Sequence, residues 1–430
     1  MNKKAWIISV NMGYGHQRTS YPLRSLSPEN KVIQANDYEG IIKKDRETWE
    51  AIRKAYEFIS SFKRIPLIGD FVFYLMDRFQ RIFAFYPKRN LSKKNIQLKQ
   101  TYATIKSGWG KDLVEKLKIK NEKLKINLPL ISTFFTPAYM AEYFDYPGDI
   151  FCIVCDADIS RTWAPFNPEK SKIKYFAPTE RVAERLKLYG VKENNIFLTG
   201  YPLPLENIGG ENMEILKDDL KYRIFNLDPN KKFFKKYKTL IETELGKLPE
   251  KSDHPLTIFF SVGGAGAQKE IGIKILKNLR EKIQKGEIKI ILSAGIKKNI
   301  KDYFEKEINK EMLFSSNIEI LYKEKIEDYF EEFNKKLRKT DILWTKPSEL
   351  SFYSALGLPI IVAPPIGSQE DFNKRWLLKS GFGLFQEDVS HTEQWLFDWL
   401  NKGYLAEASF QGFIEGEKLG TIKIKEIISK

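Results

Sequence analysis

The sequence predicts an α/β protein built from two doubly wound parallel sheets. Its 430 residues exceed one ordinary domain and favour two. In both halves, apolar runs of strand length alternate with helix-like stretches, the pattern of parallel sheets covered by helices on both faces. Each half also has a glycine-rich turn directly after its first apolar run. Hydrophobic residues form 42% of the chain and aromatic residues 13%, enough for two cores and unlike a disordered chain.

In the first half, short apolar runs separated by polar turns predict the strands. A helix is expected to begin near Arg18, and a second over residues 179–189. Gly190 should end the second helix, because glycine tolerates the left-handed conformation that follows a helix. The expected strands are residues 5–10, 31–35, 130–135, 150–155, 174–177 and 195–199.

A hinge is expected at residues 200–210, which are rich in glycine and proline. Beyond it, the highly charged residues 231–253 predict a helical excursion. The other expected elements of this half are strands 257–262, 288–293, 318–321, 341–344 and 358–363 and helices 268–284, 350–356 (ended by Gly357) and 420–430. We therefore expect domains at residues 1–205 and 206–411, with residues 412–430 packing back on the first domain.

The net charge of +15 indicates a polyanionic partner, either nucleic acid or an anionic membrane surface. No apolar run approaches the roughly 20 residues that span a bilayer, and the N-terminus does not match a signal peptide. A cytoplasmic protein is expected. Cys152 and Cys155 lie in one apolar run and would point to opposite faces of a strand. With the three histidines widely scattered, we expect two buried cysteines and no metal site.

Two groups of polar residues follow strands of the first half. Gly13, Gly15 and His16 follow the first strand, where glycines let backbone N–H groups approach a ligand and the histidine is suited to proton transfer. Asp156 ends another strand, and Asp158 and Trp163 share its loop. Carboxylates at the carboxyl ends of parallel strands are well placed for binding or base chemistry. The structural alternative is an ordinary glycine turn and a strand-end Asp that caps its loop.

The second half has two anion-friendly turns. Its first strand is followed by Gly263, Gly264 and Gly266 and then by a helix, an arrangement that can hold a diphosphate without a metal. A plain strand-to-helix turn is the alternative. Residues 340–373 read as strand, tight turn, helix and strand, so two strand ends and a helix N-terminus should meet there.

The motifs TKP, ALGLP, PIGSQE and Asn373 in that stretch resemble the monogalactosyldiacylglycerol synthase branch of the GT-B glycosyltransferases, which is related to the lipid II N-acetylglucosaminyltransferase. The resemblance implies two Rossmann-like domains facing a cleft. It implies His16 or Asp156 as the catalytic base and Gly13, Gly15, Asp158 and Trp163 as acceptor-binding residues. The donor-binding residues that it implies are Gly263, Gly264, Gly266, Thr345, Lys346, Pro347, Gln369, Glu370 and Asn373. Glu349 is a further candidate from its place at the start of the helix.

One position departs from that family. When residues 345–359 are aligned with the family's helix, its ribose-binding glutamate falls at Ser354. A carboxylate can accept charge-assisted hydrogen bonds from both ribose hydroxyls, and a serine, which has no charge, cannot. Glu349 stands where the family has glycine, and it either replaces that carboxylate or only favours the helix N-terminus.

Residues 43–106 are both basic and aromatic. They contain 15 Lys and Arg against six Asp and Glu, and eleven aromatic residues lie between Trp49 and Tyr86. Basic residues beside exposed aromatics suit an anionic bilayer surface, and the resemblance implies the same. The alternative is that the aromatics are core and the lysines a solvated face. Nucleic-acid binding fits less well, because no recognition motif accompanies the charge.

Together these observations predict a hexosyltransferase. It would use a nucleotide sugar, most simply a UDP-sugar, and a lipid or lipid-like acceptor at the cytoplasmic membrane face, with neither cofactor nor metal. One alternative is a non-catalytic nucleotide-sugar-binding protein on a degraded scaffold. Another is an epimerase of the same fold, which would need further acid and base residues. Fold alone does not decide among them.

Overall fold

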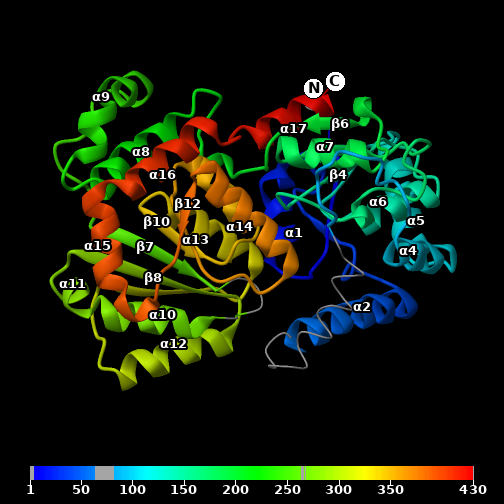
Figure 1. The fold of residues 1–430 in the computed structure, drawn as a ribbon. Helices are drawn as coiled ribbons and strands as arrows, with labels where there is room; N and C mark the ends of the chain where they lie inside the picture. The colour runs from blue at the N-terminus through cyan, green and yellow to red at the C-terminus, as the bar shows by residue number, and fades with distance from the viewer. Residues whose placement is uncertain (1–3, 63–81, 263–265, 267, 430) are drawn as a thin grey trace. The chain divides into compact units, whose positions relative to one another are not determined.

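The structure, a computed structural model, describes residues 4–62, 82–262, 266 and 268–429. The chain divides into two compact units (Figure 1). The first comprises Met1–Pro202, Ile366–Phe372 and Leu419–Lys430, and the second comprises Leu203–Pro365 and Asn373–Lys418. Each unit contains a six-stranded parallel sheet with flanking helices, so the predicted pair of Rossmann-like, doubly wound domains is confirmed.

The first sheet has the strand order β2-β1-β3-β4-β5-β6. Its strands are β1 (Trp6–Ser9), β2 (Ile33–Gln34), β3 (Leu130–Ser132), β4 (Ile150–Ile153), β5 (Lys174–Ala177) and β6 (Ile196–Leu198). The central strands β1, β3 and β4 are buried along their whole length, as expected of a parallel sheet covered on both faces. The chain moves from β1 outward to β2 and then returns past β1 to β3. The strand order therefore reverses between β1 and β3.

The described part of the first unit also contains helices. They are α1 (Tyr14–Ser20), α2 (Lys43–Phe62), α4 (Ile96–Lys106), α5 (Lys111–Leu124), α6 (Phe135–Tyr143), α7 (Glu180–Leu188) and α17 (Gly420–Ser429), with the 3₁₀ turns η1 (Tyr21–Leu26), η2 (Arg161–Trp163) and η3 (Glu193–Asn195). Ile424 and Ile428 of α17 join Ile7, Leu23 and Phe151 in one buried apolar cluster. The last helix of the chain is therefore part of the first core.

The second sheet has the order β12-β11-β10-β7-β8-β9. Its strands are β7 (Leu256–Ser261), β8 (Ile288–Gly295), β9 (Ile318–Tyr322), β10 (Ile342–Thr345), β11 (Ile360–Val362) and β12 (Gly383–Phe385). Three strands run outward on each side of the point between β7 and β10, which is the dinucleotide-binding topology. The strand order reverses there.

The described part of the second unit also contains helices. They are α8 (Glu214–Leu227), α9 (Lys232–Leu245), α10 (Lys269–Asn278), α11 (Arg280–Gln284), α12 (Lys298–Lys310), α13 (Ile326–Leu337), α14 (Ser368–Ser380), α15 (Thr392–Lys402) and α16 (Tyr404–Glu415), with η4 (Leu205–Asn207), η5 (Glu349–Leu356) and η6 (Val389–His391). The fully buried Arg223 on α8 donates to the carbonyls of Leu337, Thr340 and Leu356, and so ties α8 to the ends of α13 and η5.

Three expected elements differ from the structure. The helix expected over residues 268–284 is divided into α10 and α11. The first helix begins at Tyr14, not near Arg18, because Gly13 adopts φ 111° and serves as its N-cap. Residues 350–356 form a 3₁₀ helix, η5, not an α-helix. A 3₁₀ helix rises further per residue, which helps a short connection cross from β10 to the adjacent β11. Gly357 ends η5 at φ 65°, as predicted.

Part of the basic aromatic region is described. Trp49 on α2 is 3% exposed and packs edge-to-face on Trp109, with ring centroids 4.7 Å apart. Tyr86, in contrast, is 69% exposed. The apolar stretch 65–76 lies outside the described residues. Within the described part of residues 43–106, the aromatic side chains are thus divided between core and surface.

Candidate functional site

In the first unit, His16 lies where the strand order reverses. His16 follows β1 and Thr133 follows β3, the two strands that flank the reversal. Ligands of open α/β sheets bind at this kind of position, outside the carboxyl ends of the strands. The Nδ1 atom of the half-buried His16 lies 2.8 Å from the backbone carbonyl oxygen of Thr133.

This contact fixes the histidine tautomer. A carbonyl oxygen can only accept, so Nδ1 of His16 must carry the proton that it donates to Thr133. In the neutral ring, Nε2 then has the lone pair and is the nitrogen that can accept a proton. The rings of Phe134 and Trp163 lie 4.8 Å and 6.4 Å from the imidazole, measured between centroids. The histidine is therefore held between a backbone acceptor and aromatic rings, in an orientation suited to a general base.

The loop after β4 reaches the same place. The Sγ atom of Cys155 lies 3.5 Å from Nδ1 of His16, and the half-buried Asp156 comes next in the chain. Cys152 is buried within β4, and burial raises the pKa of its thiol well above the ordinary value. Neither cysteine forms a disulfide, and both are buried, as predicted.

Asp158 has a structural partner. Its two carboxylate oxygens accept hydrogen bonds of 2.8 Å each from Nε and Nη2 of Arg185 on α7. Both residues are buried, and Arg185 also donates to the carbonyl of Phe83. Asp158 therefore anchors its own loop to α7 and to the segment that begins at residue 82. A role in acceptor binding stays a prediction.

The glycines of the first motif have different surroundings. Gly13 is exposed, and a Cβ atom there would meet nothing within 4 Å, so only its φ of 111° requires glycine. The carbonyl of Gly15 accepts a hydrogen bond from the Thr19 hydroxyl at 2.7 Å within α1. Trp163 is 3% exposed, and its ring is one of the aromatic rings beside His16.

In the second unit, the order reverses between β7 and β10, and both predicted turns follow these strands. The Thr345 hydroxyl, at the end of β10, donates to the carbonyl of Ser261 at the end of β7 over 3.2 Å. Gly266 is buried at φ 67°, where a Cβ atom would approach Ile300 to 2.7 Å. Gly263 and Gly264 lie outside the described residues. The described part of the turn is thus tightly packed and requires glycine at position 266.

Glu349 and Ser354 both lie on η5, the helix that follows Thr345. Glu349 is in the first turn and 8% exposed. Ser354 is 1% exposed, and its hydroxyl donates to the Ser351 carbonyl at 2.8 Å. Its backbone carbonyl lies so close to Gly412 of α16 that a Cβ there would approach it to 2.4 Å. Ser354 therefore packs against α16. Glu349 has the carboxylate on η5 and is closer along the chain to the end of β10.

The remaining predicted donor residues lie on both sides of η5. Pro347 is buried, and its carbonyl accepts a 3.3 Å hydrogen bond from the Asn373 side chain. Lys346 is half-buried. Gln369 and Glu370 lie in the first turn of α14, in the stretch assigned to the first unit, whereas Asn373 on the same helix belongs to the second. The Glu370 carboxylate accepts from the backbone N–H of Ile366 at 2.7 Å.

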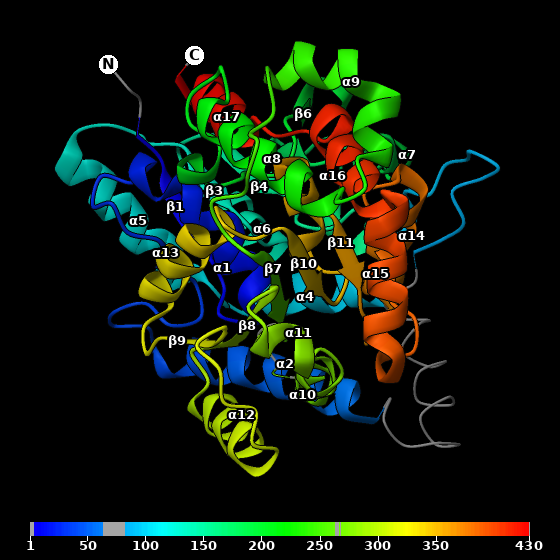
Figure 2. The same ribbon diagram turned by 90° about the vertical axis from the view of Figure 1, so that its left-hand side faces the viewer.

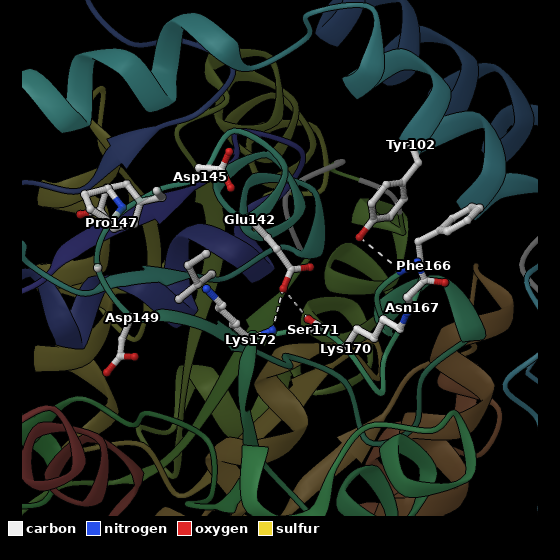
Figure 3. Close-up of a pocket in the computed structure, with 13 residues that line it drawn as sticks. Tyr102, Glu142, Asp145, Pro147, Asp149, Phe166, Asn167, Lys170, Ser171 and Lys172 are labelled. Carbon is white, nitrogen blue, oxygen red and sulfur yellow. Dashed lines mark hydrogen bonds between the residues drawn. The ribbon is translucent and has the colours of Figure 1, made fainter.

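A cavity of about 530 Å³ lies elsewhere in the first unit. Its lining includes Asp149, just before β4, and Lys170 and Lys172, in the segment that leads into β5 (Figure 3). The Glu142 carboxylate accepts there from the Ser171 hydroxyl and the Lys172 N–H, both at 2.7 Å. Since His16 and Asp156 follow the ends of their strands, this cavity is at the opposite edge of the sheet from them.

Sequence reasoning did not find Thr133, Cys155 or Arg185. The contact of Thr133 is made by its backbone carbonyl, which leaves no trace in residue type. Arg185 lies on an amphipathic helix, where an arginine is usually solvated. Among the residues that the structure describes, no group of three or more His, Cys, Asp or Glu could hold a metal ion, and no helix is long and apolar enough to cross a membrane.

Comparison with known proteins gives low but consistent similarity. A family model described as a domain of unknown function, DUF6938, matches residues 247–336. A processive diacylglycerol beta-glucosyltransferase of Bacillus subtilis is 24% identical over 236 residues, 54% of this chain and 50% of that protein. The protein of the same name from Bacillus licheniformis is 23% identical over 231 residues. The chain spans about half the length of the curated relatives that it matches.

Among solved structures, MurG of Acinetobacter baumannii superposes with a TM-score of 0.45 at 13% identity, over 84% of this chain and 88% of that one. The resemblance drawn from the motifs is confirmed: the chain resembles GT-B glycosyltransferases, and the curated relatives are named as diacylglycerol glucosyltransferases.

Proposed function

We propose that this chain is a glycosyltransferase that moves a hexose from a nucleotide sugar, most simply a UDP-sugar, to a lipid or lipid-like acceptor at the cytoplasmic membrane face. The observation that supports it most directly is His16, whose Nδ1 is held by the Thr133 carbonyl at the reversal of the first sheet. The names of the curated relatives support the choice of a lipid acceptor.

In this proposal Nε2 of His16 takes the proton of the acceptor hydroxyl as that oxygen bonds to the anomeric carbon of the sugar. The bond from this carbon to the diphosphate oxygen breaks, and the nucleoside diphosphate leaves with the bonding electrons. Asp156 orients the acceptor. The glycine turn after β7 and the turn at Thr345–Pro347 bind the diphosphate, where oriented N–H groups stabilise the developing charge.

The direct test is to incubate the purified chain with UDP-glucose, UDP-galactose and UDP-N-acetylglucosamine in turn, together with total membrane lipids, and to analyse the lipids by mass spectrometry. A mass gain of one hexose or N-acetylhexosamine is expected with one donor and should form much more slowly with the His16→Ala variant. No transfer from any donor, together with no binding of UDP, GDP or dTDP in calorimetry at millimolar concentration, would reject the proposal.

Ser354 supports a second candidate, a nucleotide-sugar-binding protein without transferase activity. The hydroxyl of Ser354 is buried and bonded to the Ser351 carbonyl, so the carboxylate expected from the family is absent at that position. This candidate predicts nucleotide binding in calorimetry with no sugar transfer to any lipid.

Membrane attachment through residues 43–106 is part of the main proposal. Exposed Tyr86 and the excess of basic residues support it. Vesicle flotation should show binding to anionic liposomes that weakens as salt rises, because surface charges are screened. Equal binding to neutral liposomes would indicate that charge has no role.

A further inference from the structure

Helix α9 of the second unit has a strongly basic exposed surface. Five lysines at or near its start are exposed: Lys231, Lys232, Lys235, Lys236 and Lys238. Within the part of the chain that the structure describes, only Lys238 of these five has a carboxylate within 4.0 Å, that of Glu242. Four positive charges between Lys231 and Lys236, at the start of α9, therefore have no carboxylate within that distance among the described residues.

The order of charges along α9 is unfavourable for the helix itself. The N-terminus of a helix carries a partial positive charge, which favours acids and disfavours lysines. α9 has no acidic residue in its first turn. Its N-terminal N–H groups are capped from outside by buried Asp228, which accepts from the N–H of Lys232 at 2.9 Å and of Phe234 at 2.7 Å. The stability of α9 thus does not account for the lysines at its start. Residues that disfavour their own helix in this way are expected at functional positions.

The opposite side of α9 is fixed to its unit. Phe233, Ile241 and Leu245 are buried, and the Phe233 ring lies 5.8 Å from that of Phe410 on α16. α9 contacts α8, α15 and α16 and lies on the outer side of this helical layer in both ribbon views (Figures 1 and 2). The helix is therefore firmly seated, with its lysines presented to solvent.

We infer that the exposed face of α9 docks on anionic phospholipid headgroups. The charge of this face is complementary to such a surface. α9 is kinked at Tyr237 (φ −118°, ψ 22°), exposes Leu240 by 47% beyond the kink and leaves Phe234 and Tyr237 half-buried. A row of lysines beside apolar and aromatic side chains is the composition of helices that lie flat in a bilayer interface. A nucleic-acid phosphate backbone would use the lysines and not Leu240, so the lipid surface is the better fit.

This surface is separate from residues 43–106, and it does not depend on the proposed sugar transfer. Its test uses the full chain with residues 43–106 unchanged and contains no nucleotide sugar, so a failed transferase assay and a failed docking assay are distinguishable. The test variant changes Lys232, Lys235 and Lys236 to Gln.

The matched control changes three ion-paired lysines of α12 to Gln. α12 lies in the same unit; Lys298 and Lys310 are exposed and Lys301 is half-buried. Lys298, Lys301 and Lys310 are paired with Asp302, Glu305 and Glu307, respectively. Both variants alter surface side chains only, and circular dichroism verifies that they are folded. Binding is measured by flotation with vesicles of phosphatidylcholine alone or mixed with phosphatidylglycerol.

We expect the α9 variant to bind the phosphatidylglycerol vesicles on the order of 10²-fold more weakly than the native chain, at about fivefold per lysine. The α12 variant should bind like the native chain, and neither variant should change binding to phosphatidylcholine alone. Unchanged binding of the α9 variant overturns the inference, as does an equal loss in the α12 variant. A loss of binding to duplex DNA or RNA with vesicle binding retained also overturns it and identifies a nucleic-acid surface.

Discussion

Nδ1 of His16 donates to the backbone carbonyl of Thr133 over 2.8 Å, although 117 positions separate the two residues in the chain. A backbone acceptor stays neutral at every pH, so the tautomer of His16 does not depend on the ionisation of a neighbouring acid. Because Nδ1 is engaged in this way, Asp156 is better suited to act on an acceptor than to orient the histidine. This arrangement makes the role of each residue separately measurable.

His16→Ala should lower the turnover number by about 10²–10⁴-fold, the usual contribution of a general base. The affinity for UDP should stay unchanged, since the two turns proposed to bind the diphosphate, after β7 and at Thr345–Pro347, belong to the second unit. Initial rates of sugar transfer and calorimetric titration with UDP measure the two quantities. Full turnover in His16→Ala would remove the base assignment and leave Asp156 as the next candidate.

Glu349→Gln should weaken UDP binding by about 10–100-fold if this carboxylate accepts from the nucleotide, because a hydrogen bond to a charged group contributes about 1.5–3 kcal/mol. The change keeps the size of the side chain and removes only the charge. Calorimetry with UDP and with UMP measures the loss. An affinity equal to that of the native chain would show that Glu349 only favours the start of η5.

Ser354→Glu restores the residue type of the resembling family, yet it should not restore a ribose contact. Ser354 is 1% exposed and packs against α16 at Gly412. A carboxylate forced into that place would be buried without a partner, and we expect a loss of several kcal/mol of unfolding free energy. Urea denaturation measures it, with Ser354→Ala as the small control. A stable variant with tighter UDP binding would contradict the observed packing.

The fold was largely predictable because strand and helix patterns are local. Apolar runs identified β5 at its observed bounds, and Gly357 identified the end of η5. The turns after β7 and β10 could be predicted because strand ends and turn residues follow one another in the chain, and their role in donor binding stays a prediction. The His16–Thr133 contact could not be predicted, since any residue has a carbonyl. The Asp158–Arg185 pair, 27 positions apart, depends on how α7 packs on its sheet.

Arg185→Met should destabilise the first unit by about 3–5 kcal/mol, the usual cost of leaving one member of a buried ion pair uncompensated. Arg185 and Asp158 form a two-point contact in which both side chains are less than a tenth exposed. The double variant Arg185→Met, Asp158→Leu should regain much of the loss, because it removes the orphaned charge. Urea denaturation of the two single variants and the double variant gives the coupling free energy between the two side chains. A single variant as stable as the native chain would mean that solvent replaces the guanidinium.

His254 in the second unit connects two carboxylates. Its Nε2 lies 3.2 Å from the buried Asp341, and its Nδ1 contacts Asp253. Burial alone would lower the pKa of His254, but the hydrogen bond and charge of Asp341, joined by those of Asp253, raise it above the ordinary value of 6.5. Burial would raise the pKa of Asp253, but its hydrogen bonds to His254 and Lys339 lower it below 3.8.

These shifts predict how stability depends on pH. A raised folded pKa means that the His254 contribution is complete below pH 6.5 and is lost as pH rises through the folded value. The lowered pKa of Asp253 means that its contribution is present above pH 3.8 and is lost as pH falls. Unfolding free energy should therefore be highest between these limits and decrease toward alkaline pH.

His254→Gln should remove the alkaline decrease and lower the unfolding free energy at pH 6 by about 1–3 kcal/mol, since Asp341 then loses a charged partner. His391 is the matched control: it is 60% exposed and lies 3.5 Å from Asp388, and its ion pair should contribute little. Urea denaturation across the pH range is the measurement for both variants. Of these two histidines, His254 is the one whose charge lies next to a carboxylate that is shielded from water. If His254→Gln keeps the native pH profile, or if His391→Gln flattens it, the pH dependence of stability does not arise from the His254–Asp341 pair.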